Sequence, residues 1–467
     1  MSGNKKSAYL IGVKGVGMTA LAIYLKQAGF EVEGSDNQNT YTTDEILSQA
    51  QIQVHEGFDK ENIVDKKPDF CVISAAYGLD NPEVKFANRR LKPIYYSEML
   101  GKISAPSRTI AVAGVHGKTT TTALIALMLK IANLDPSFII GAAKVPNLGS
   151  PAHFGKGEYF VLEADEYRQS PQNLNSKFFD LNPEIAIISS IEFDHTDMFA
   201  TIDEIYQAFY KFACRVPRRG SIILCLDYPK CRKLKNSLVD RNFETYGFGS
   251  DAAWRVVNVT ERDKTKFSLE HQGELLGPYE IQIPGRHNIL NATAAIILAK
   301  RLDISEEIIK RVLREFSGVG RRFEKVGEVG DIQIYDDYAH HPTAISKTLE
   351  AARAKFPNSK IWCIFQPHTY SRTKGLLKEF GLAFDVADKV VVCDICASER
   401  EKQGDITTQD LVDEIAKSQK NVRYFSDFEK IKKYLIDFVK GPAVIITMGA
   451  GDIYKLGQEL INEFKHE

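Results

Sequence analysis

Short apolar runs alternate with helical patterns along almost the whole chain. The runs are rich in Val, Ile and Ala and too short for helices, and the segments between them carry apolar residues at helical spacing. Strands of this kind are apolar on both faces, as in parallel sheets that helices cover on both sides. The pattern therefore predicts an α/β fold of doubly wound parallel sheets, whose ligands bind beyond the carboxyl ends of the strands.

The alternation falls into three blocks, and 467 residues at roughly 150 per domain give the same number of domains. A Pro-containing linker at residues 104–107 separates the first block from the second. Residues 245–283 are predicted to form short strands and turns, and a Gly- and Arg-containing interruption at residues 317–322 precedes the third block. The expected domains are residues 1–106, 107–319 and 320–467.

Composition excludes several classes of protein. Lys and Arg total 60 and Asp and Glu total 61, so the net charge of −1 predicts neither a nucleic-acid nor a membrane partner. The hydrophobic fraction of 44% is that of a globular chain, and no apolar stretch approaches the roughly 20 residues that span a bilayer. Residues 1–7 lead into the first predicted strand without an apolar signal segment, so we expect a cytoplasmic protein.

The seven cysteines are scattered, and most lie in apolar runs. Cys393 and Cys396 have C-x-x-C spacing, but no second cysteine pair or histidine pair accompanies them at the spacing of a zinc site. Free cysteine is commonly buried. We therefore predict core thiols rather than redox or metal chemistry.

The most specific motif is a glycine-rich loop between an apolar run and a helical pattern, the setting of a phosphate-binding loop. Its residues are Gly114, Val115, His116, Gly117, Lys118, Thr119 and Thr120. Backbone N–H groups at the start of a helix attract phosphate oxygens, a lysine adds a full positive charge, and a threonine hydroxyl can bind Mg²⁺. Val112 stands where the common pattern has glycine, so the loop is shorter and begins at Gly114.

Two later runs of the second block lead into acidic or imidazole side chains. Glu163, Asp165 and Glu166 lie at the end of one run, and Glu192, Asp194 and His195 lie at the end of another. If both strands are parallel neighbours of the loop strand, these side chains open onto the phosphate loop and can bind the divalent metal that a nucleoside triphosphate requires. Taken singly, such carboxylates are usually helix caps and a lone histidine is usually structural, but the shared placement favours a metal site.

Near the N-terminus, Gly15 and Gly17 join a predicted strand to a helix, and Asp36 ends the next apolar run. The arrangement is similar to a dinucleotide-binding turn, except that Lys14 occupies a position where that pattern requires glycine. We predict a phosphate-binding turn here, and the motif gives only weak support for nicotinamide binding.

Polar clusters follow two predicted strands of the third block. Asp337, Tyr338 and His340 follow the first strand, and His368 and Arg372 follow the second. These are ligand positions in a doubly wound sheet, although helix-start and core polar groups are the alternative interpretation.

The order of these motifs resembles the Mur ligases, a family of ATP-dependent, amide-forming enzymes of peptidoglycan precursor synthesis. The resemblance covers nearly the whole chain and includes three further motifs, at residues 284–291, 320–323 and 336–342. It implies a Rossmann-like N-terminal domain for a uridine nucleotide, a P-loop ATPase-type central domain and a Rossmann-like C-terminal domain. It also implies that ATP is a substrate and that Mg²⁺ is required.

The resemblance implies roles for individual residues as well. The implied catalytic residues are Lys118, Glu163, His195 and Arg322. The implied metal ligands are Thr119, Glu163 and His195. Besides the phosphate loop, the implied ATP contacts are Asn288, Asn291, Arg322 and Asp337. The implied contacts to the other substrates are Gly15, Gly17, Asp36, Tyr338, His340, His368 and Arg372.

Family members activate a carboxylate as an acyl phosphate, which an incoming amine then attacks. Residues 365–373 and 448–452 are similar to members that add free L-alanine to UDP-N-acetylmuramate, although Thr369 stands where many of these carry arginine. The stretch 163–183 is longer than in those members, and together with residues 192–199 it is similar to recycling members that add the tripeptide L-Ala-γ-D-Glu-meso-diaminopimelate. We expect L-alanine, because the third domain selects the amine in this family and its stretch 368–372 is similar to the members that use free alanine. A nucleotide-binding protein without catalysis is a different class, which the intact Lys118 argues against.

Overall fold

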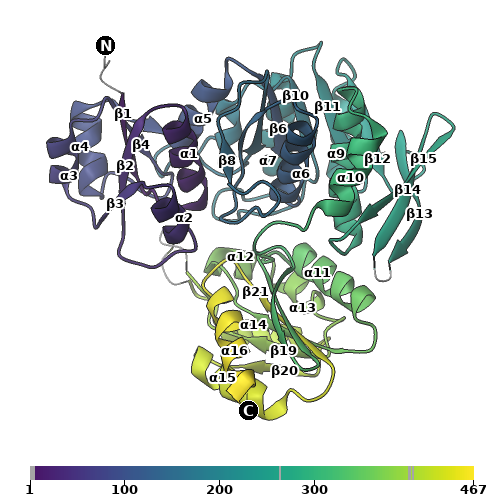
Figure 1. Cartoon of the computed structure of the whole chain (residues 1–467). Helices are drawn as coiled ribbons and strands as arrows, with labels where there is room; N and C mark the ends of the chain where they lie inside the picture. Colours follow the sequence, from purple (N-terminus) through teal and green to yellow (C-terminus); the bar gives the residue numbers. More distant parts are fainter. Residues whose placement is uncertain (1–5, 262–263, 398–400, 402–403, 467) are drawn as a thin grey trace.

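The computed structural model describes residues 6–261, 264–397, 401 and 404–466. Figure 1 shows three lobes, with the purple N-terminal lobe beside the blue and teal central lobe, and the green and yellow C-terminal lobe below them. Each lobe is built around one sheet with helices packed against it. The predicted α/β class with three sheet-containing domains is confirmed, whereas the residue limits of the domains stay a prediction.

The N-terminal sheet is wholly parallel, with the strand order β3-β2-β1-β4-β5. Its strands are β1 (Ser7–Ile11), β2 (Glu31–Asp36), β3 (Gln53–Glu56), β4 (Phe70–Ile73) and β5 (Ile94–Tyr95). The helices are α1 (Val16–Gln27), α2 (Asp44–Gln49), α3 (Lys60–Lys66), α4 (Pro82–Arg90) and α5 (Tyr96–Ser104). The predicted glycine turn joins β1 to α1 at the carboxyl edge of this sheet.

The central sheet has the strand order β15-β14-β13-β12-β11-β10-β6-β9-β7-β8. Its strands are β6 (Arg108–Ala113), β7 (Ser137–Ile139), β8 (Ala152–His153), β9 (Tyr159–Ala164), β10 (Ile185–Ile188), β11 (Ser221–Cys225), β12 (Phe243–Gly247), β13 (Trp254–Glu261), β14 (Thr265–His271) and β15 (Glu274–Ile281). The helices are α6 (Lys118–Ile131), the short 3-10 helix η1 (Lys177–Asp180), α7 (Ile202–Arg215), α8 (Pro229–Ser237), α9 (Arg286–Arg301) and α10 (Glu306–Glu315). Strands β13 to β15 form an antiparallel extension, with the predicted hairpin tip between β14 and β15.

The C-terminal sheet has the strand order β16-β17-β21-β18-β19-β20, and β16 is its antiparallel edge. Its strands are β16 (Glu324–Val329), β17 (Ile332–Asp337), β18 (Lys360–Phe365), β19 (Lys389–Val392), β20 (Val422–Tyr424) and β21 (Ala443–Met448). The helices are α11 (Pro342–Lys355), α12 (Tyr370–Gly375), α13 (Leu377–Leu382), α14 (Thr408–Ile415), α15 (Phe428–Phe438) and α16 (Tyr454–His466). The edge strands β5 and β8 have two residues each, too few to stand out in the sequence.

The junction between the first two domains is apolar. One continuous cluster of buried side chains includes residues of β1 and α1 as well as residues of β6, α6 and β9. At the boundary, the ring of Tyr24 packs against Phe154 and Phe160, with centroid distances of 5.5 and 5.3 Å. The C-terminal domain has separate apolar clusters on the two faces of its own sheet. The first two domains are therefore packed as one body, and the third has its own core.

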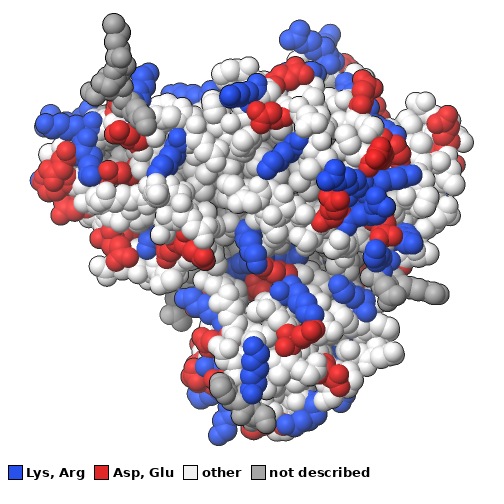
Figure 2. Space-filling model, in the orientation of Figure 1, with Lys and Arg blue, Asp and Glu red and all other residues white. Residues whose placement is uncertain are grey.

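The structure shows the state of the cysteines and the distribution of charge. All seven cysteines are free, and five of them are buried, so the C-x-x-C spacing of Cys393 and Cys396 forms no disulfide. Figure 2 shows acidic and basic side chains interspersed over one face of the molecule. None of the helices within residues 6–261, 264–397 and 404–466 is both long and apolar enough to cross a membrane. Residues 1–5, part of the stretch expected to lack a signal segment, lie outside the described residues.

The close packing of α5 on the central domain gives a stability prediction. A Cβ at Gly101 would overlap the backbone oxygen of Asp180 at the end of η1. We expect Gly101→Ala to lower the free energy of unfolding by about 1–3 kcal/mol, because a rigid backbone atom must move. Chemical denaturation followed by circular dichroism measures the change.

Gly457→Ala is the matched control, since this helical glycine would make only ordinary contacts, the nearest to Thr447 Oγ1 at 3.4 Å. It should leave stability unchanged or raise it by up to about 1 kcal/mol through helix propensity. Equal effects of the two substitutions would contradict the packing argument.

Candidate active site

One large cavity lies where the three domains meet. Its volume is about 1430 Å³, and α1 and α2, the phosphate loop, and the start of the C-terminal domain all contribute to its lining. Figure 2 shows charged side chains of both signs in the hollow between the upper lobes and the lower lobe. The cavity is reached from the carboxyl ends of the central strands, where ligands bind in sheets of this type.

The phosphate loop connects β6 to α6 through two glycines with left-handed backbone angles, Gly114 at φ 134° and Gly117 at φ 81°. A Cβ on Gly117 would overlap the side chain of Asn291. Gly117 therefore meets two constraints, a positive φ and a close neighbour, that only glycine satisfies without strain. The N–H of His116 donates to Ser190 Oγ at 2.9 Å, so the loop is also fixed from β10.

Lys118 opens α6 and is held inside the site. Its Nζ donates to Gly114 O at 2.6 Å and to the carboxylate of Glu166 at 2.8 Å. Burial alone would lower the pKa of Lys118, but the charges of Glu166 and Asp165 raise it overall. The lysine is therefore a fully charged group whose partner is the buried Glu166, a carboxylate that follows β9.

Glu163, the penultimate residue of β9, faces the first turn of α6. Its Oε2 accepts from Thr119 Oγ1 at 3.1 Å, and its Oε1 accepts from the N–H of Gly141 at 2.6 Å. Burial raises the pKa of Glu163 in spite of the positive charges of Lys118 and Arg322. Thr119 and Glu163, two of the predicted metal ligands, are therefore in direct contact.

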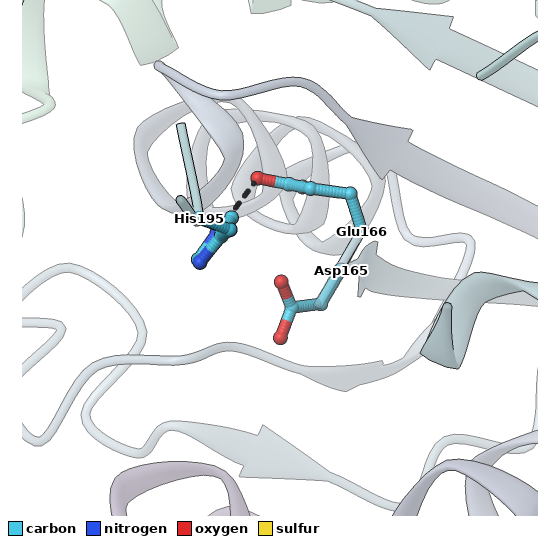
Figure 3. Close-up of side chains that lie close together, drawn as sticks. All are labelled: Asp165, Glu166 and His195. Atoms are coloured by element: carbon cyan, nitrogen blue, oxygen red, sulfur yellow. Dashed lines mark ion pairs between the residues drawn. The ribbon is translucent and has the colours of Figure 1, made fainter. Parts of the chain in front are cut away.

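The third predicted metal ligand, His195, lies with a different pair of carboxylates. Ligand atoms of Asp165, Glu166 and His195 all lie within 4.8 Å of one another. Figure 3 shows the two carboxyl groups at the end of β9 and the imidazole facing them, with His195 Nε2 3.3 Å from Glu166 Oε1. Burial by itself would lower the pKa of His195, but Asp194 and Glu166 raise it overall. Glu166 was expected at this strand end together with Glu163 and Asp165, but not its pairing with Lys118 and His195.

The predicted adenine contacts lie at the start of α9. Asn291 Nδ2 donates to Asn288 Oδ1 at 3.1 Å, and Asn288 Nδ2 donates to Pro284 O at 2.7 Å. Both asparagines line the cavity, as does the preceding His287. Burial lowers the pKa of His287 to about 3, which keeps the imidazole neutral. Sequence analysis did not single out His287, although it is adjacent to Asn288 in the motif.

The start of the C-terminal domain closes the cavity from below. Asp337 accepts from the N–H groups of Phe323 and Ala339 at 2.8 and 2.7 Å. Burial raises the pKa of Asp337 to about 6, although Arg322 lies close enough to oppose the shift. The guanidinium of Arg322 lies over the ring of Tyr338, 5.0 Å from its centroid.

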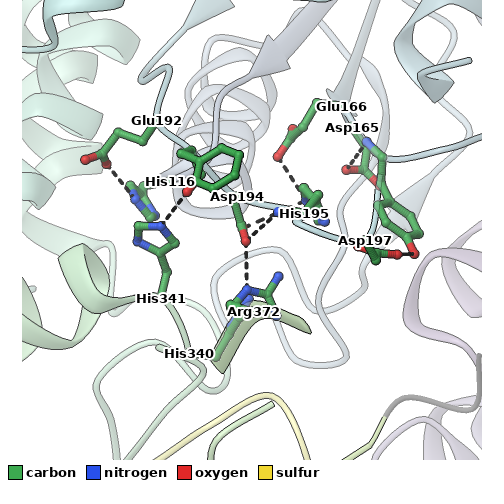
Figure 4. Close-up of polar contacts among 12 residues, drawn as sticks. His116, Asp165, Glu166, Glu192, Asp194, His195, Asp197, His340, His341 and Arg372 are labelled. Atoms are coloured by element: carbon green, nitrogen blue, oxygen red, sulfur yellow. Dashed lines mark hydrogen bonds and ion pairs between the residues drawn. The ribbon is translucent and has the colours of Figure 1, made fainter. Parts of the chain in front are cut away.

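A buried ion pair joins the central and C-terminal domains. Arg372 Nε donates to Asp194 Oδ1 at 2.7 Å, and the two side chains are 7% and 6% exposed. Arg372 Nη1 also donates to His368 O at 3.2 Å. Figure 4 shows Asp194 between His195 and Arg372, so one carboxylate contacts predicted site residues of two domains.

A second polar connection between the domains runs from the phosphate loop. His116 Nε2 lies 2.8 Å from Glu192 Oε2, and Thr343 Oγ1 of α11 donates to Glu192 Oε1 at 3.1 Å. His341 Nε2 lies 3.0 Å from the backbone oxygen of Phe193. Burial by itself would raise the pKa of Glu192, but the surrounding positive groups lower it to about 2. Sequence analysis did not single out this connection, because it joins residues far apart in the chain.

The predicted turn of the N-terminal domain is held by Asp36. Its carboxylate accepts from the N–H of Lys14 at 2.7 Å, the N–H of Asn37 at 2.8 Å and the hydroxyl of Tyr77 at 2.8 Å. The buried Lys14 donates through Nζ to Asn39 O at 3.0 Å, so this side chain fastens the loop after β2. Asp36 and Lys14 thus shape the turn through its backbone.

Most of the predicted site residues share the cavity. Those that line it are Gly17, Val115, His116, Gly117, Lys118, Thr119, Thr120, Glu163, Asp165, Glu166, Asp194, His195, Asn288, Asn291, Arg322, Asp337, Tyr338 and His340. Among the described residues, the predicted ones outside the lining are Gly15, Asp36, Gly114, Glu192, His368 and Arg372. Gly15, Gly114 and Asp36 shape the two glycine turns, and His368 with Arg372 lies next to His340, whose ring centroid is 6.1 Å from that of His368.

A phosphate loop and a cavity lined by three domains are typical of an enzyme that uses a nucleoside triphosphate. Family models agree with this class. The Mur ligase catalytic domain model matches residues 7–108, the Mur ligase middle domain model matches residues 112–299, and the glutamate ligase domain model matches residues 321–451. The chain belongs to the Mur ligase family of ATP-dependent, amide-forming ligases.

Similar proteins extend over nearly the full length. The UDP-N-acetylmuramate–L-alanine ligase of Desulfitobacterium hafniense (strain Y51) is 38% identical, over 97% of this chain and 99% of the relative. The enzyme of the same name from Alkaliphilus metalliredigens (strain QYMF) is 38% identical, over 98% and 97%. The crystal structure of the UDP-N-acetylmuramate-alanine ligase from Thermotoga maritima matches with a TM-score of 0.81 at 25% identity, over 98% and 99%.

A solved structure of a ligase that is named for the tripeptide also matches. The UDP-N-acetylmuramate:L-alanyl-γ-D-glutamyl-meso-diaminopimelate ligase from Neisseria meningitides is 29% identical, with a TM-score of 0.62 over 68% of this chain and 100% of that chain. The match is lower in TM-score and coverage than that of the Thermotoga enzyme.

The low pKa of Glu192 predicts a pH-dependent effect of Glu192→Gln. The pKa of this carboxyl falls from 4.5 in the unfolded chain to about 2 in the folded protein. Such a group stabilises the folded state by up to about 3 kcal/mol at pH values above 4.5. The variant should therefore be less stable than the wild type at pH 7. The difference should shrink as the pH falls below about 5, because the contribution is lost as the pH approaches the folded pKa.

Urea denaturation at several pH values between 7 and 4 measures both proteins. Glu463→Gln, at an exposed position near the end of α16, is the control and should show little difference at any pH. A difference for Glu192→Gln that is constant with pH would rule out the charge as its cause.

Proposed function

We propose that this protein joins L-alanine to the carboxylate of UDP-N-acetylmuramate at the expense of ATP, a step of peptidoglycan precursor synthesis. The observation that carries the proposal is the cavity of about 1430 Å³ that all three domains line, with the phosphate loop in its wall. Relatives named for this reaction match nearly the full chain at 36–38% identity and support the choice of both substrates. We place the reaction in the cytoplasm, where ATP and nucleotide sugars are available.

We assign one ligand to each domain: the uridine nucleotide to residues 1–106, ATP to 107–319 and the amine to 320–467. The positions of the loop and Lys118 support binding of the ATP phosphates, since backbone N–H groups and an ammonium group meet at the start of α6. Adenine is assigned to Asn288 and Asn291, and the ribose to Asp337. Arg322 reaches the same cavity from the third domain and supplies a further positive charge.

Mg²⁺ fits two neighbouring sets of side chains in this cavity. Thr119 and Glu163 offer a hydroxyl and a carboxylate oxygen beside the loop, and Asp165, Glu166 and His195 offer oxygens and an imidazole nitrogen within 4.8 Å. The bound ion neutralises negative charge on the phosphates. We assign Glu163, His195 and Thr119 to metal binding and add Asp165 and Glu166 to them.

In the proposed reaction, the substrate carboxylate attacks the γ-phosphate of ATP and releases ADP. The amine then attacks the acyl phosphate and releases phosphate, which leaves the amide. The chain's own side chains position the reactants and stabilise charge, as in other phosphoryl transfers. Lys118 is well placed for the transferring group, because its ammonium is buried and its carboxylate partner Glu166 can be exchanged for phosphate oxygens.

We assign the amine and the muramoyl end to Tyr338, His340, His368 and Arg372. Their side chains gather at the junction of the central and C-terminal domains, close to Asp194 and His195. Arg372 is anchored by Asp194, and a guanidinium fixed in this way is suited to a carboxylate such as that of alanine. Gly15, Gly17 and Asp36 form the turn that we assign to the uridine diphosphate.

The alternative amine is the tripeptide. The long segment after β9 supports it, since this segment reaches the N-terminal domain, where Tyr95 donates to Gln172 Oε1 at 3.4 Å. A panel of amines decides between the two. With ATP, Mg²⁺ and UDP-N-acetylmuramate present, phosphate release is expected with L-alanine and not with L-Ala-γ-D-Glu-meso-diaminopimelate. Turnover with the tripeptide alone would identify a recycling ligase.

Lys118→Ala should abolish the reaction without loss of the uridine nucleotide. We expect kcat to fall by roughly 10³-fold or more, because the charge next to the transferring phosphoryl group is lost. Calorimetry should give a Kd for UDP-N-acetylmuramate within about threefold of the wild type, since that ligand is assigned to another domain.

Lys130→Ala is the matched control, an exposed lysine in the last turn of the same helix. It should retain activity. Loss of uridine-nucleotide binding in a folded Lys118→Ala protein would argue against the separate sites.

A further inference from the structure

The segment that follows β9 places an aromatic ring against His195. The ring centroids of Tyr167 and His195 are 4.7 Å apart, with the planes inclined at 41°. The hydroxyl of Tyr167 donates to Asp197 Oδ2 at 2.5 Å. Tyr167 therefore contacts the turn that carries His195 at two points, through its ring and through its hydroxyl.

The backbone of this turn is already fixed by hydrogen bonds. His195 has a left-handed φ of 52°, and its N–H donates to Asp194 Oδ1 at 2.7 Å. The N–H groups of Met198 and Phe199 both donate to His195 O, at 2.8 and 2.9 Å. A non-glycine residue keeps such a backbone only where its surroundings hold it. The direction of the imidazole depends on its own neighbours, which are Glu166 at 3.3 Å, Asp194 at 3.9 Å and the ring of Tyr167.

Tyr167 is itself held between two cations. Lys177 Nζ lies 5.5 Å and the Arg168 guanidinium 5.3 Å from the centre of its ring. Lys177 also pairs with Asp165 at 2.6 Å, and Arg168 lies 3.7 Å from Asp197. The two cations thus link the tyrosine to Asp165 and Asp197, and a rotation of the ring away from His195 would break these contacts.

We propose that Tyr167 is a positioning residue that fixes the imidazole of His195 toward Asp165 and Glu166. It has this effect by contact with the ring and by anchorage to Asp197, two residues further along the same turn. Figure 4 shows His195 paired with Glu166, with Asp165 and Asp197 to one side of the imidazole. This inference rests on the proposed function only in taking these three side chains as the divalent-metal site.

The test compares Tyr167→Leu, which removes the ring, with Tyr167→Phe, which removes only the hydroxyl. Mn²⁺ binding to each folded protein, measured by electron paramagnetic resonance with a non-hydrolysable ATP analogue present, is the direct readout. We expect Leu to weaken Mn²⁺ binding about 10- to 100-fold, the usual effect of losing a group that orients a ligand, and Phe to weaken it less than about fivefold. In the phosphate-release assay, Tyr167→Leu should lower kcat by a similar factor. Its KM for UDP-N-acetylmuramate should stay within about threefold of the wild-type value.

Tyr424→Leu and Tyr424→Phe are the matched controls, since Tyr424 on β20 also donates to an aspartate, Asp394, at 2.5 Å. Neither should change Mn²⁺ binding. Unchanged Mn²⁺ binding in folded Tyr167→Leu would overturn the proposal. If Tyr167→Leu does not fold, Tyr167→Phe decides instead. The proposal then requires that Tyr167→Phe weakens Mn²⁺ binding more than Tyr424→Phe does. Failure of the wild type to turn over any amine would refute the proposed function, and the Mn²⁺ comparison would still decide the role of Tyr167.

Discussion

The parallel pairing of β6 with β9 on one side and β10 on the other determines the arrangement of the active site. Parallel strands end at the same edge of a sheet, so the phosphate loop after β6 meets the carboxylates after β9 and the Asp194–His195 turn after β10. Lys118, Glu166 and His195 can interact only because these three strand ends are adjacent. The charged site is then surrounded by buried apolar strands, where its electrostatic interactions are weakly screened.

The two domain junctions differ in their chemistry. The first two domains share a continuous apolar cluster, and separating them would expose that surface to water. The C-terminal domain meets the central domain through polar pairs, among them Asp194 with Arg372 and Glu192 with Thr343, and through Phe193, which packs against its apolar cluster. Polar contacts can be exchanged for water or substrate with little loss, so this junction is suited to opening and closing around ligands. Glu192 also contacts His116, which links the position of the third domain to the phosphate loop.

Sequence patterns predicted the central strands and the phosphate loop well, because buried parallel strands are apolar throughout and the loop needs glycine, lysine and threonine at fixed spacing. They placed Glu192 at a strand end with Asp194 and His195, but they did not predict its partners His116 and Thr343, which lie on a loop and a helix far away in the chain. The same holds for Tyr167, which lies in a segment without periodicity and acquires its neighbours only in the fold. Lys14 was a visible departure from the glycine pattern, but its contact with Asn39 depends on how the loop after β2 returns.

The sequence by itself determined the α/β class, the three-part organisation, the phosphate loop and the family, since each of these is recorded in local residue types and their order. Tertiary structure alone decided which carboxylates meet which cations. It paired Lys118 with Glu166. It placed His195 with Asp165 and Glu166, whereas Thr119 contacts Glu163. It also joined Asp194 to Arg372 across two domains. The physical reason is that such interactions depend on distances of a few ångströms between residues far apart in the chain, and those distances are set by strand order and domain packing.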